Sequence, residues 1–362
     1  MKSPVDPVPL HFVWDYTDVD RRFWQEHLAD WLPERIFDAH VHLSLPEHLL
    51  VEPTDEMRRQ YWVNELLAPM DAPTLDRCDA TVWPGRRVEH LAFGWPSLNF
   101  DVEAQNNYAS AVCAARGWRC LVLLRPQWPA GRVARELARP GVIGVKPYYA
   151  MLGCDADTRD RYLEASIFDF LPRRALDVLD ERRAWVTLHV PGAARLADPR
   201  NIAEVREIRR RWPNVALVIA HLGRSYTLPH AEESLPRLAD DPGLYFDISA
   251  VLNPDVLRFA IETIGPGRLI YGTDNPVFYM RGRRQWRGRT YVNRTNYPFH
   301  FNKDREPPEV EATYTLYMYE ALRALRQACE SCGLERGQVE AIFRGNALRL
   351  IEAASSRGAA GD

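Results

Sequence analysis

The sequence lacks long apolar runs and a strong charge excess, and each absence excludes a class of protein. No stretch approaches the roughly 20 apolar residues of a membrane-spanning helix, and the first residues, MKSPVDPVPLHF, lack the apolar core of a signal peptide. The 46 basic and 49 acidic residues leave a net charge of −3. A field of this size would not hold nucleic acid or an anionic membrane. We therefore expect a cytoplasmic protein with neither as a partner.

Cysteines are also few, and they are scattered. Of six in 362 residues, only Cys329 and Cys332 form a C-x-x-C pair, within a charged stretch that we expect to be helical. Ordinary helix cysteines explain this pair better than a metal site, because no second pair accompanies it. The absence of a disulfide framework is typical of a reducing compartment.

Short apolar, β-rich runs recur along the chain and alternate with polar or amphipathic stretches. Most runs are continuously apolar, as expected of parallel strands covered on both faces. The eight runs are Ile36–His42, Ala80–Trp83, Cys120–Arg125, Val142–Tyr148, Trp185–Val190, Val215–His221, Leu244–Ser249 and Leu269–Asp274. Eight β/α units predict an α/β protein with a (β/α)₈ TIM barrel.

The chain exceeds a minimal barrel in several places. We expect residues 1–35 to form an N-terminal extension that packs on the barrel and plugs or flanks its base, and residues 36–362 to form a single barrel domain. Long insertions follow strand one (residues 44–79) and strand eight (residues 275–307). Loops after strands lie on the catalytic face, so both insertions should shape the substrate pocket. Residues 308–350 predict two further helices outside the barrel.

A histidine pair ends the first run. In IFDAHVHL, His40 and His42 are two residues apart, so on a strand both imidazoles face the same way, into the barrel mouth. Neutral imidazole is a good ligand for Zn, Fe or Mn, and two on one wall make half a metal site. The motif is weak evidence alone, because buried histidines often only form hydrogen bonds.

Other predicted strands also end in chemically active residues. They are Lys146 on strand four, His189 on strand five, His221 on strand six and Asp274 on strand eight. Convergence of such groups at the C-terminal rim is how barrels build active sites. A divalent metal there would lower the pKa of water from about 16 to about 7. Asp274 is placed to accept the proton of the attacking water and pass it to the leaving group.

The segment after strand eight is rich in arginine and aromatic residues, and it includes Arg283 and Arg284. Guanidinium groups bind carboxylate or phosphate bidentately, which predicts a small anionic substrate. The other interpretation is a surface loop whose arginines pair with acids elsewhere. Tyr148 and Trp83 lie at predicted strand ends and are candidates to line the pocket, although large aromatics there often only pack.

These motifs together resemble the amidohydrolase superfamily, in particular its amidohydrolase-2 branch. The resemblance runs from about Ile36 to Ile351 and rests on the H-x-H pair, the His-Leu-Gly after strand six, LYFDIS, Gly-Thr-Asp-x-Pro after strand eight and the closing IFRGNALRLI. It does not cover residues 1–35 or 281–307 well. We expect those two segments to set substrate choice.

The resemblance implies roles for individual residues. His40, His42, His189 and Asp274 would contact metal, and His221 would either bind a second metal or serve as a catalytic acid/base that contacts substrate. Lys146 matches the position where binuclear relatives carry a carbamylated lysine that bridges two metals. Members with one metal often have a lysine here that only touches substrate.

The resulting hypothesis is a metal-dependent hydrolase that acts on an amide, lactone, ester or thioester of a carboxylated substrate. One or two divalent ions would be bound, with Zn favoured over Fe or Mn. The alternative enzyme is a metal-dependent, non-oxidative decarboxylase of an aromatic or unsaturated acid. A third class, a barrel that only binds ligand or scaffolds partners, is disfavoured by the intact ligand set. The sequence is compatible with a homodimer and does not name the substrate.

Overall fold

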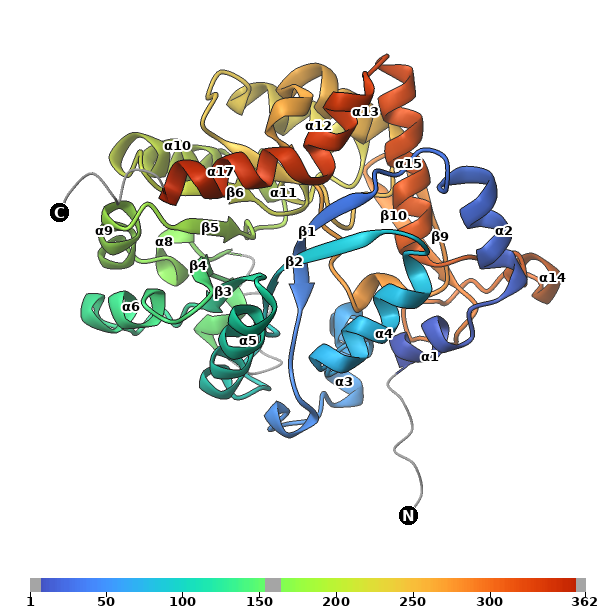
Figure 1. Cartoon of the computed structure of the whole chain (residues 1–362), viewed down its shortest axis with the longest axis horizontal. Coiled ribbons are helices and arrows are strands. Elements are labelled where there is room, and N and C mark those ends of the chain that lie inside the picture. Colours follow the sequence, from blue (N-terminus) through green and yellow to red (C-terminus); the bar gives the residue numbers. More distant parts are fainter. Residues whose placement is uncertain (1–7, 154–163, 356–362) are drawn as a thin grey trace.

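The computed structural model describes residues 8–153 and 164–355, and its centre is an eight-stranded parallel sheet (Figure 1). Neighbouring strands in the sheet follow chain order from β1 to β8. The strands are β1 (Arg35–His42), β2 (Arg87–Phe93), β3 (Arg119–Leu123), β4 (Val142–Lys146), β5 (Trp185–Leu188), β6 (Ala216–Ile219), β7 (Tyr245–Asp247) and β8 (Leu269–Ile270). Each pairs in parallel with the next.

The sheet closes on itself between its first and last strands. The Ala39 amide donates to the Tyr271 carbonyl at 3.0 Å, and the Asp274 amide donates to the His40 carbonyl at 2.8 Å. The carboxylate of Asp38, on β1, reinforces this contact by accepting the amide and the hydroxyl of Thr273 at 2.9 and 2.6 Å. The predicted (β/α)₈ TIM barrel is thereby confirmed.

Helices surround the barrel and connect its strands (Figure 1). Their bounds are α1 (Val8–Trp14), α2 (Asp18–His27), α3 (Asp55–Gln60), α4 (Ala72–Val82), α5 (Val102–Arg116), α6 (Ala130–Leu137), α8 (Ile167–Phe170), α9 (Arg173–Glu181), α10 (Pro199–Arg211), α11 (His221–Arg224), α12 (Leu228–Ser234), α13 (Pro254–Ile264), α14 (Pro308–Glu311), α15 (Tyr317–Ser331), α16 (Arg336–Glu340) and α17 (Asn346–Ser355). None of these described helices is long and apolar enough to cross a bilayer.

The sequence-based position of the second strand is wrong. Ala80–Trp83 includes the C-terminal turn of α4, and the strand is β2. The apolar end of α4 packs into the core and so resembles a strand in composition. By contrast, β2 begins with the exposed Arg87 and becomes fully buried only from His90 onward.

The N-terminal extension packs along one side of the barrel. Helix α1 contacts the short turn η8 (Val277–Tyr279) that follows β8, and α2 contacts α15. Figure 1 shows α1 and α2 on the same side of the molecule as β9 and β10. The extension therefore adjoins the segment that follows β8.

The insertion after β8 is more regular than the loop that the sequence predicts. It contains an antiparallel hairpin of β9 (Gly282–Arg287) and β10 (Thr290–Thr295), in which Arg284 lies opposite Asn293. The C-terminal region also differs from the prediction, because residues 308–350 hold more than two helices. Gly333, with φ of +64°, follows the end of α15 and redirects the chain into α16.

Candidate active site

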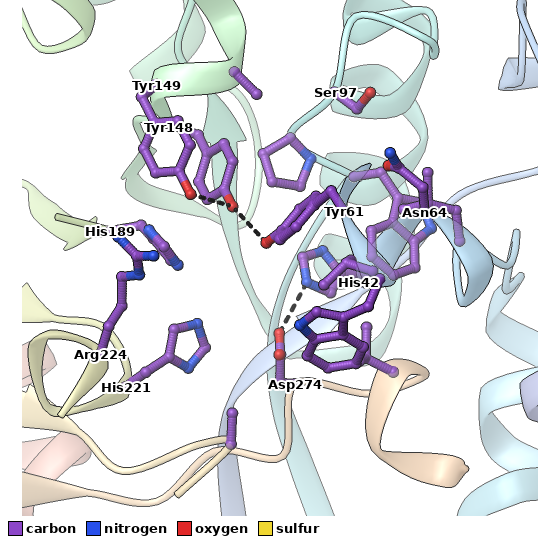
Figure 2. A pocket seen from close by; sticks show the side chains of 18 of the residues that line it. His42, Tyr61, Asn64, Ser97, Tyr148, Tyr149, His189, His221, Arg224 and Asp274 are labelled. Atoms are coloured by element: carbon purple, nitrogen blue, oxygen red, sulfur yellow. Dashed lines mark hydrogen bonds and ion pairs between the residues drawn. The ribbon is translucent and has the colours of Figure 1, made fainter. Parts of the chain in front are cut away.

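All six predicted metal or catalytic residues line one cavity of about 360 Å³ at the C-terminal ends of the strands. They are His40, His42, Lys146, His189, His221 and Asp274. In Figure 2, His189 and His221 face His42 across the cavity, with Asp274 close to His42. The side chains come from β1, β4 and the segments after β5, β6 and β8, so the barrel is what brings them together.

Asp274 lies between the two histidines of β1. Its Oδ1 atom is 3.2 Å from His42 Nε2 and 3.4 Å from His40 Nε2. On the other side of its ring, His42 Nδ1 donates to the carbonyl of Gly94 at 3.1 Å. This contact fixes the ring so that Nε2 faces Asp274. The prediction that both β1 imidazoles face the barrel mouth is confirmed.

Asp247, the last residue of β7, and Ser249, two residues later, orient the imidazoles of His40 and His221. His40 Nδ1 lies 2.5 Å from Asp247 Oδ2, and His221 Nδ1 lies 3.1 Å from the carbonyl oxygen of Ser249. A second-sphere carboxylate on a ligating histidine sets the tautomer and raises the basicity of the free nitrogen. Sequence reasoning missed Asp247. The sequence feature that could have indicated it is a single acidic residue within the mostly apolar run LYFDIS.

The donor set fits a divalent metal ion. Ligand atoms of His40, His221 and Asp274 all lie within 4.8 Å of one another. His189 adds a buried Nδ1 that has no hydrogen-bond partner among the described residues. Nitrogen donors with one carboxylate suit Zn and also Fe or Mn. Asp274 itself has a φ of +65°, an uncommon conformation for a residue other than glycine, as is found at functional sites.

Burial and neighbouring charges shift the pKa values of the histidines and of Asp274 toward the forms that bind a metal. Burial lowers the pKa of His40, His189 and His221, which favours the neutral form of each ring. Burial alone would raise the pKa of Asp274, but nearby His221 and His42 outweigh it and hold that pKa below its usual value. Neutral imidazoles beside an ionised carboxylate are the forms that bind a metal.

Lys146 is the remaining member of the set. Its Nζ atom lies 3.2 Å from His40 Nε2 and 4.9 Å from the centre of the Phe93 ring. Burial lowers the pKa of Lys146 to about 8, against the opposing effect of Asp247 and Asp274. At this pKa about one tenth of the lysine is neutral at pH 7, and the neutral amine is the form that reacts with CO₂.

A left-handed turn after β6 brings two side chains into the cavity. All four residues from His221 to Arg224 have positive φ. Gly223 is required there, because a Cβ atom at this position would lie 2.4 Å from Leu196 Cβ. Left-handed backbone is costly for the other three residues, and such strain concentrates at functional sites. The turn places both His221 and Arg224 on the cavity wall.

The four predicted substrate-binding residues divide into two pairs. Tyr148 and Arg284 line the cavity, whereas Arg283 and Trp83 do not. Arg283 alternates with Arg284 on β9, points away and pairs with Glu306 at 2.7 Å. Trp83 was predicted at the end of a strand, but it is buried at the C-terminal end of α4. Neither residue therefore lines this cavity.

Sequence reasoning also missed several cavity residues. The structure adds Arg195, Arg224, Tyr61, Tyr226 and Tyr291. Arg195 and Tyr61 lie in irregular segments whose course depends on tertiary contacts, and the sequence offers no periodic pattern there.

Comparisons with known proteins identify the family and the fold of this chain. The Amidohydro_2 family model, described as amidohydrolase, matches residues 37–352. A search of curated proteins finds no match. Among solved structures, a probable 2-pyrone-4,6-dicarboxylic acid hydrolase from Acinetobacter baumannii is 13% identical, with 87% of this chain and 98% of that chain covered and a TM-score of 0.54.

Two further solved structures have the same fold. A zinc-bound amidohydrolase from Burkholderia multivorans is 15% identical, with 87% of this chain and 98% of that chain covered and a TM-score of 0.54. The 5-carboxyvanillate decarboxylase from Sphingomonas paucimobilis is 14% identical, with 88% and 99% covered and a TM-score of 0.50. The family match over most of the chain, together with this barrel and ligand set, shows that the protein belongs to the amidohydrolase-2 family, whose members are hydrolases and non-oxidative decarboxylases.

Proposed function

We propose that the protein is a metal-dependent hydrolase of an amide, lactone, ester or thioester that carries an anionic, carboxylated group. The observation that carries this proposal is that the metal donor set and three arginines share one cavity, Arg195, Arg224 and Arg284. A donor set for metal supports attack by water on a carbonyl, and guanidinium groups support recognition of a carboxylate.

His40, His42, His189 and Asp274 would hold the metal, with Zn favoured by the imidazole-rich set. A bound divalent ion supplies Lewis acidity, which polarises a carbonyl and acidifies water. Asp247 holds His40 in the tautomer that presents Nε2 to the cavity. Ser249 does the same for His221 through its backbone carbonyl.

Proton transfer is assigned to Asp274 and His221. The Asp274 carboxylate is ionised and faces the cavity, so it can take a proton from the attacking water and return it to the leaving group. His221 has Nδ1 engaged by Ser249 and Nε2 open to the cavity, where it can contact the substrate carbonyl or a second ion. Two ions would need Lys146 as a bridging carbamate.

A decarboxylase is the second candidate, and the contact between Lys146 and His40 is the observation that favours it. As an ammonium group, Lys146 could bind a substrate carboxylate directly beside the metal donors. The reacting carboxylate would then sit where the hydrolase holds its carbonyl. The two candidates therefore differ in chemistry at the same place.

Product analysis distinguishes these candidates. Zinc-loaded protein is incubated in H₂¹⁸O with carboxylated lactones, esters, thioesters and amides, and separately with aromatic and unsaturated acids. A hydrolase incorporates ¹⁸O into the new carboxylate, whereas a decarboxylase releases CO₂. Chelator-treated protein and the Asp274→Asn variant serve as controls and should be inactive. CO₂ release without ¹⁸O-labelled product would contradict the hydrolase.

A further inference from the structure

The charges that face the cavity are unbalanced. Among the described lining residues, Arg195, Arg224 and Arg284 are cationic, and Asp274 is the single carboxylate. A metal ion would increase this excess of positive charge. Buried charges are costly unless they are paired, so the cavity is built to receive anionic groups from a ligand.

The three arginines have no acidic partner within residues 8–153 and 164–355. Arg224 donates to the carbonyl of Gly192 at 2.9 Å, and Arg284 donates to the carbonyl of Ala250 at 2.9 Å. Arg195 donates to the carbonyl of Arg224 at 3.0 Å. These neutral contacts orient the guanidinium groups, and no carboxylate among the described residues pairs with their charge.

Other arginines of the insertion after β8 show the contrast. Arg281, Arg283 and Arg289 each form an ion pair with a carboxylate, and none of them lines the cavity. Exposure does not explain the difference, because Arg284 is 5% exposed. Arg284 is therefore a buried arginine of this insertion that lines the cavity and has no carboxylate partner among the described residues.

The three guanidinium groups also lie close together. Arg195 and Arg284 both face the ring of Tyr226, at 5.4 and 5.3 Å from its centre, and Arg284 lies 4.4 Å from the centre of the Tyr291 ring. Burial lowers the pKa of Arg195, and the charges of Arg224 and Arg284 lower it further. Aromatic faces offset part of this repulsion. A ligand that brings negative charge would offset the remainder.

We propose that Arg195, Arg224 and Arg284 form a subsite, here named the arginine subsite, for a dianionic part of the substrate. The dianion is either two carboxylates or one phosphate, since both present several oxygens to forked donors. A cavity of about 360 Å³ is at the small end for ligand pockets, which favours a compound of about one ring. This inference rests on the proposed function and narrows its substrate class from anionic to dianionic.

Binding of unreactive ring compounds tests the subsite separately from catalysis. Isothermal titration of the zinc-loaded protein compares benzoate, isophthalate (two carboxylates) and phenyl phosphate. We expect at least one dianion to bind roughly 10–100-fold more tightly than benzoate, the range for charge-assisted hydrogen bonds. Tighter binding of isophthalate assigns the subsite to two carboxylates, and tighter binding of phenyl phosphate assigns it to one phosphate.

Arginine variants test which residues cause the tighter binding of dianions. Arg224→Gln and Arg284→Gln should each remove most of the dianion preference, and Arg224→Lys, which keeps the charge but not the fork, should restore part of it. Arg283→Gln is the matched control, because Arg283 neighbours Arg284 on β9 but pairs with Glu306 outside the cavity. Thermal unfolding of every variant verifies that it is folded.

The outcomes separate the subsite from the proposed function. Equal binding of all three compounds by the wild type would overturn the subsite, as would an undiminished preference in Arg224→Gln and Arg284→Gln. A preference that disappears in chelator-treated protein would assign it to the metal and overturn the subsite as well. A preference that depends on the arginines supports the subsite even if no hydrolysis is found, in which case only the proposed function fails.

Discussion

Asp20 and Arg281, 261 residues apart in the chain, form a buried ion pair that joins α2 to the segment after β8. Arg281 Nη1 donates to both carboxylate oxygens of Asp20, at 2.6 and 2.7 Å. The Thr315 hydroxyl donates to the same carboxylate at 2.8 Å. Arg281 immediately precedes β9, and Arg284 lies on β9. The ion pair therefore anchors the β9–β10 hairpin to the N-terminal extension.

Removing one partner of this pair should be strongly destabilising. We expect Asp20→Asn to lower the free energy of unfolding by about 3–5 kcal/mol, because it leaves the Arg281 charge buried without a counterion. In a cycle of the wild type, Asp20→Leu, Arg281→Met and the double variant, the double variant should lose less stability than the sum of the losses of Asp20→Leu and Arg281→Met. Chemical denaturation of all four proteins measures the coupling, and additive losses would show that the pair contributes no coupling energy.

Metal content should depend on the β1 histidines. His40→Ala combined with His42→Ala removes two nitrogen donors that face Asp274, so we expect bound metal to fall while the circular dichroism spectrum stays that of the folded barrel. His300→Ala is the control, because His300 is exposed and pairs with Glu65. Elemental analysis after dialysis provides the measurement. Full occupancy in the double variant would disprove the assignment of these ligands.

Asp247 should act through His40 and not on the substrate. It does not line the cavity, and its contact with His40 Nδ1 is what fixes the orientation of that ring. We expect Asp247→Asn to weaken metal affinity by roughly 10–100-fold. Competition with a chromophoric chelator measures the affinity. Excess metal should then restore much of the activity, and an unchanged affinity would make Asp247 merely structural.

Lys146 determines the number of ions. If it is a bridging carbamate, ¹³CO₂ should produce a carbamate signal in the ¹³C spectrum, and Lys146→Ala should lose about one metal per chain. Short carboxylic acids should partly restore the variant by replacing the bridge. We expect this result if the site holds two ions. Unchanged metal content and no carbamate signal would support one ion and the decarboxylase.

The buried pair of His90 and Asp79 predicts a pH dependence of stability. His90 Nε2 lies 2.7 Å from Asp79 Oδ2; burial lowers the pKa of His90, but Asp79, with a contribution from Asp38, raises it above its usual value overall. A raised pKa stabilises the fold below the unfolded-state pKa of about 6.5, and this contribution is lost as the pH rises through the folded-state value.

His90→Gln tests that dependence. The variant should be less stable than the wild type by on the order of 1–3 kcal/mol near pH 6, with the difference shrinking as the pH increases. Urea unfolding at several pH values gives the comparison. A difference that is constant with pH would mean that the pair contributes by packing alone.

The ligand set could be predicted from the sequence because each member ends an apolar run, and the barrel gathers strand ends whatever their exact length. β8 is only two residues long, yet Asp274 still reaches the site through backbone bonds to β1. The second strand could not be placed, because its first residues are polar and the end of α4 is apolar. Composition over a few residues does not distinguish a buried helix end from a strand.

The arginines that face the cavity were harder to predict than the metal ligands. Arg283 and Arg284 are adjacent and chemically identical, and only the register of β9 against β10 decides which side chain faces inward. Arg195 and Arg224 belong to turns with positive φ, whose paths depend on contacts far away in the sequence. Such positions are determined by tertiary structure, and no local pattern marks them.

The candidate site needs residues from both the first strand and the segment after the last strand, so it forms only when the barrel closes. His42 and Asp274 are 232 residues apart and meet only where the first strand joins the last. A nascent or proteolytically shortened chain that ends before β8 retains the β1 imidazoles but lacks the carboxylate between them. Metal capture with the intact donor set is therefore reserved for chains synthesised through Asp274, and a partly made chain has no complete site in which to hold an ion.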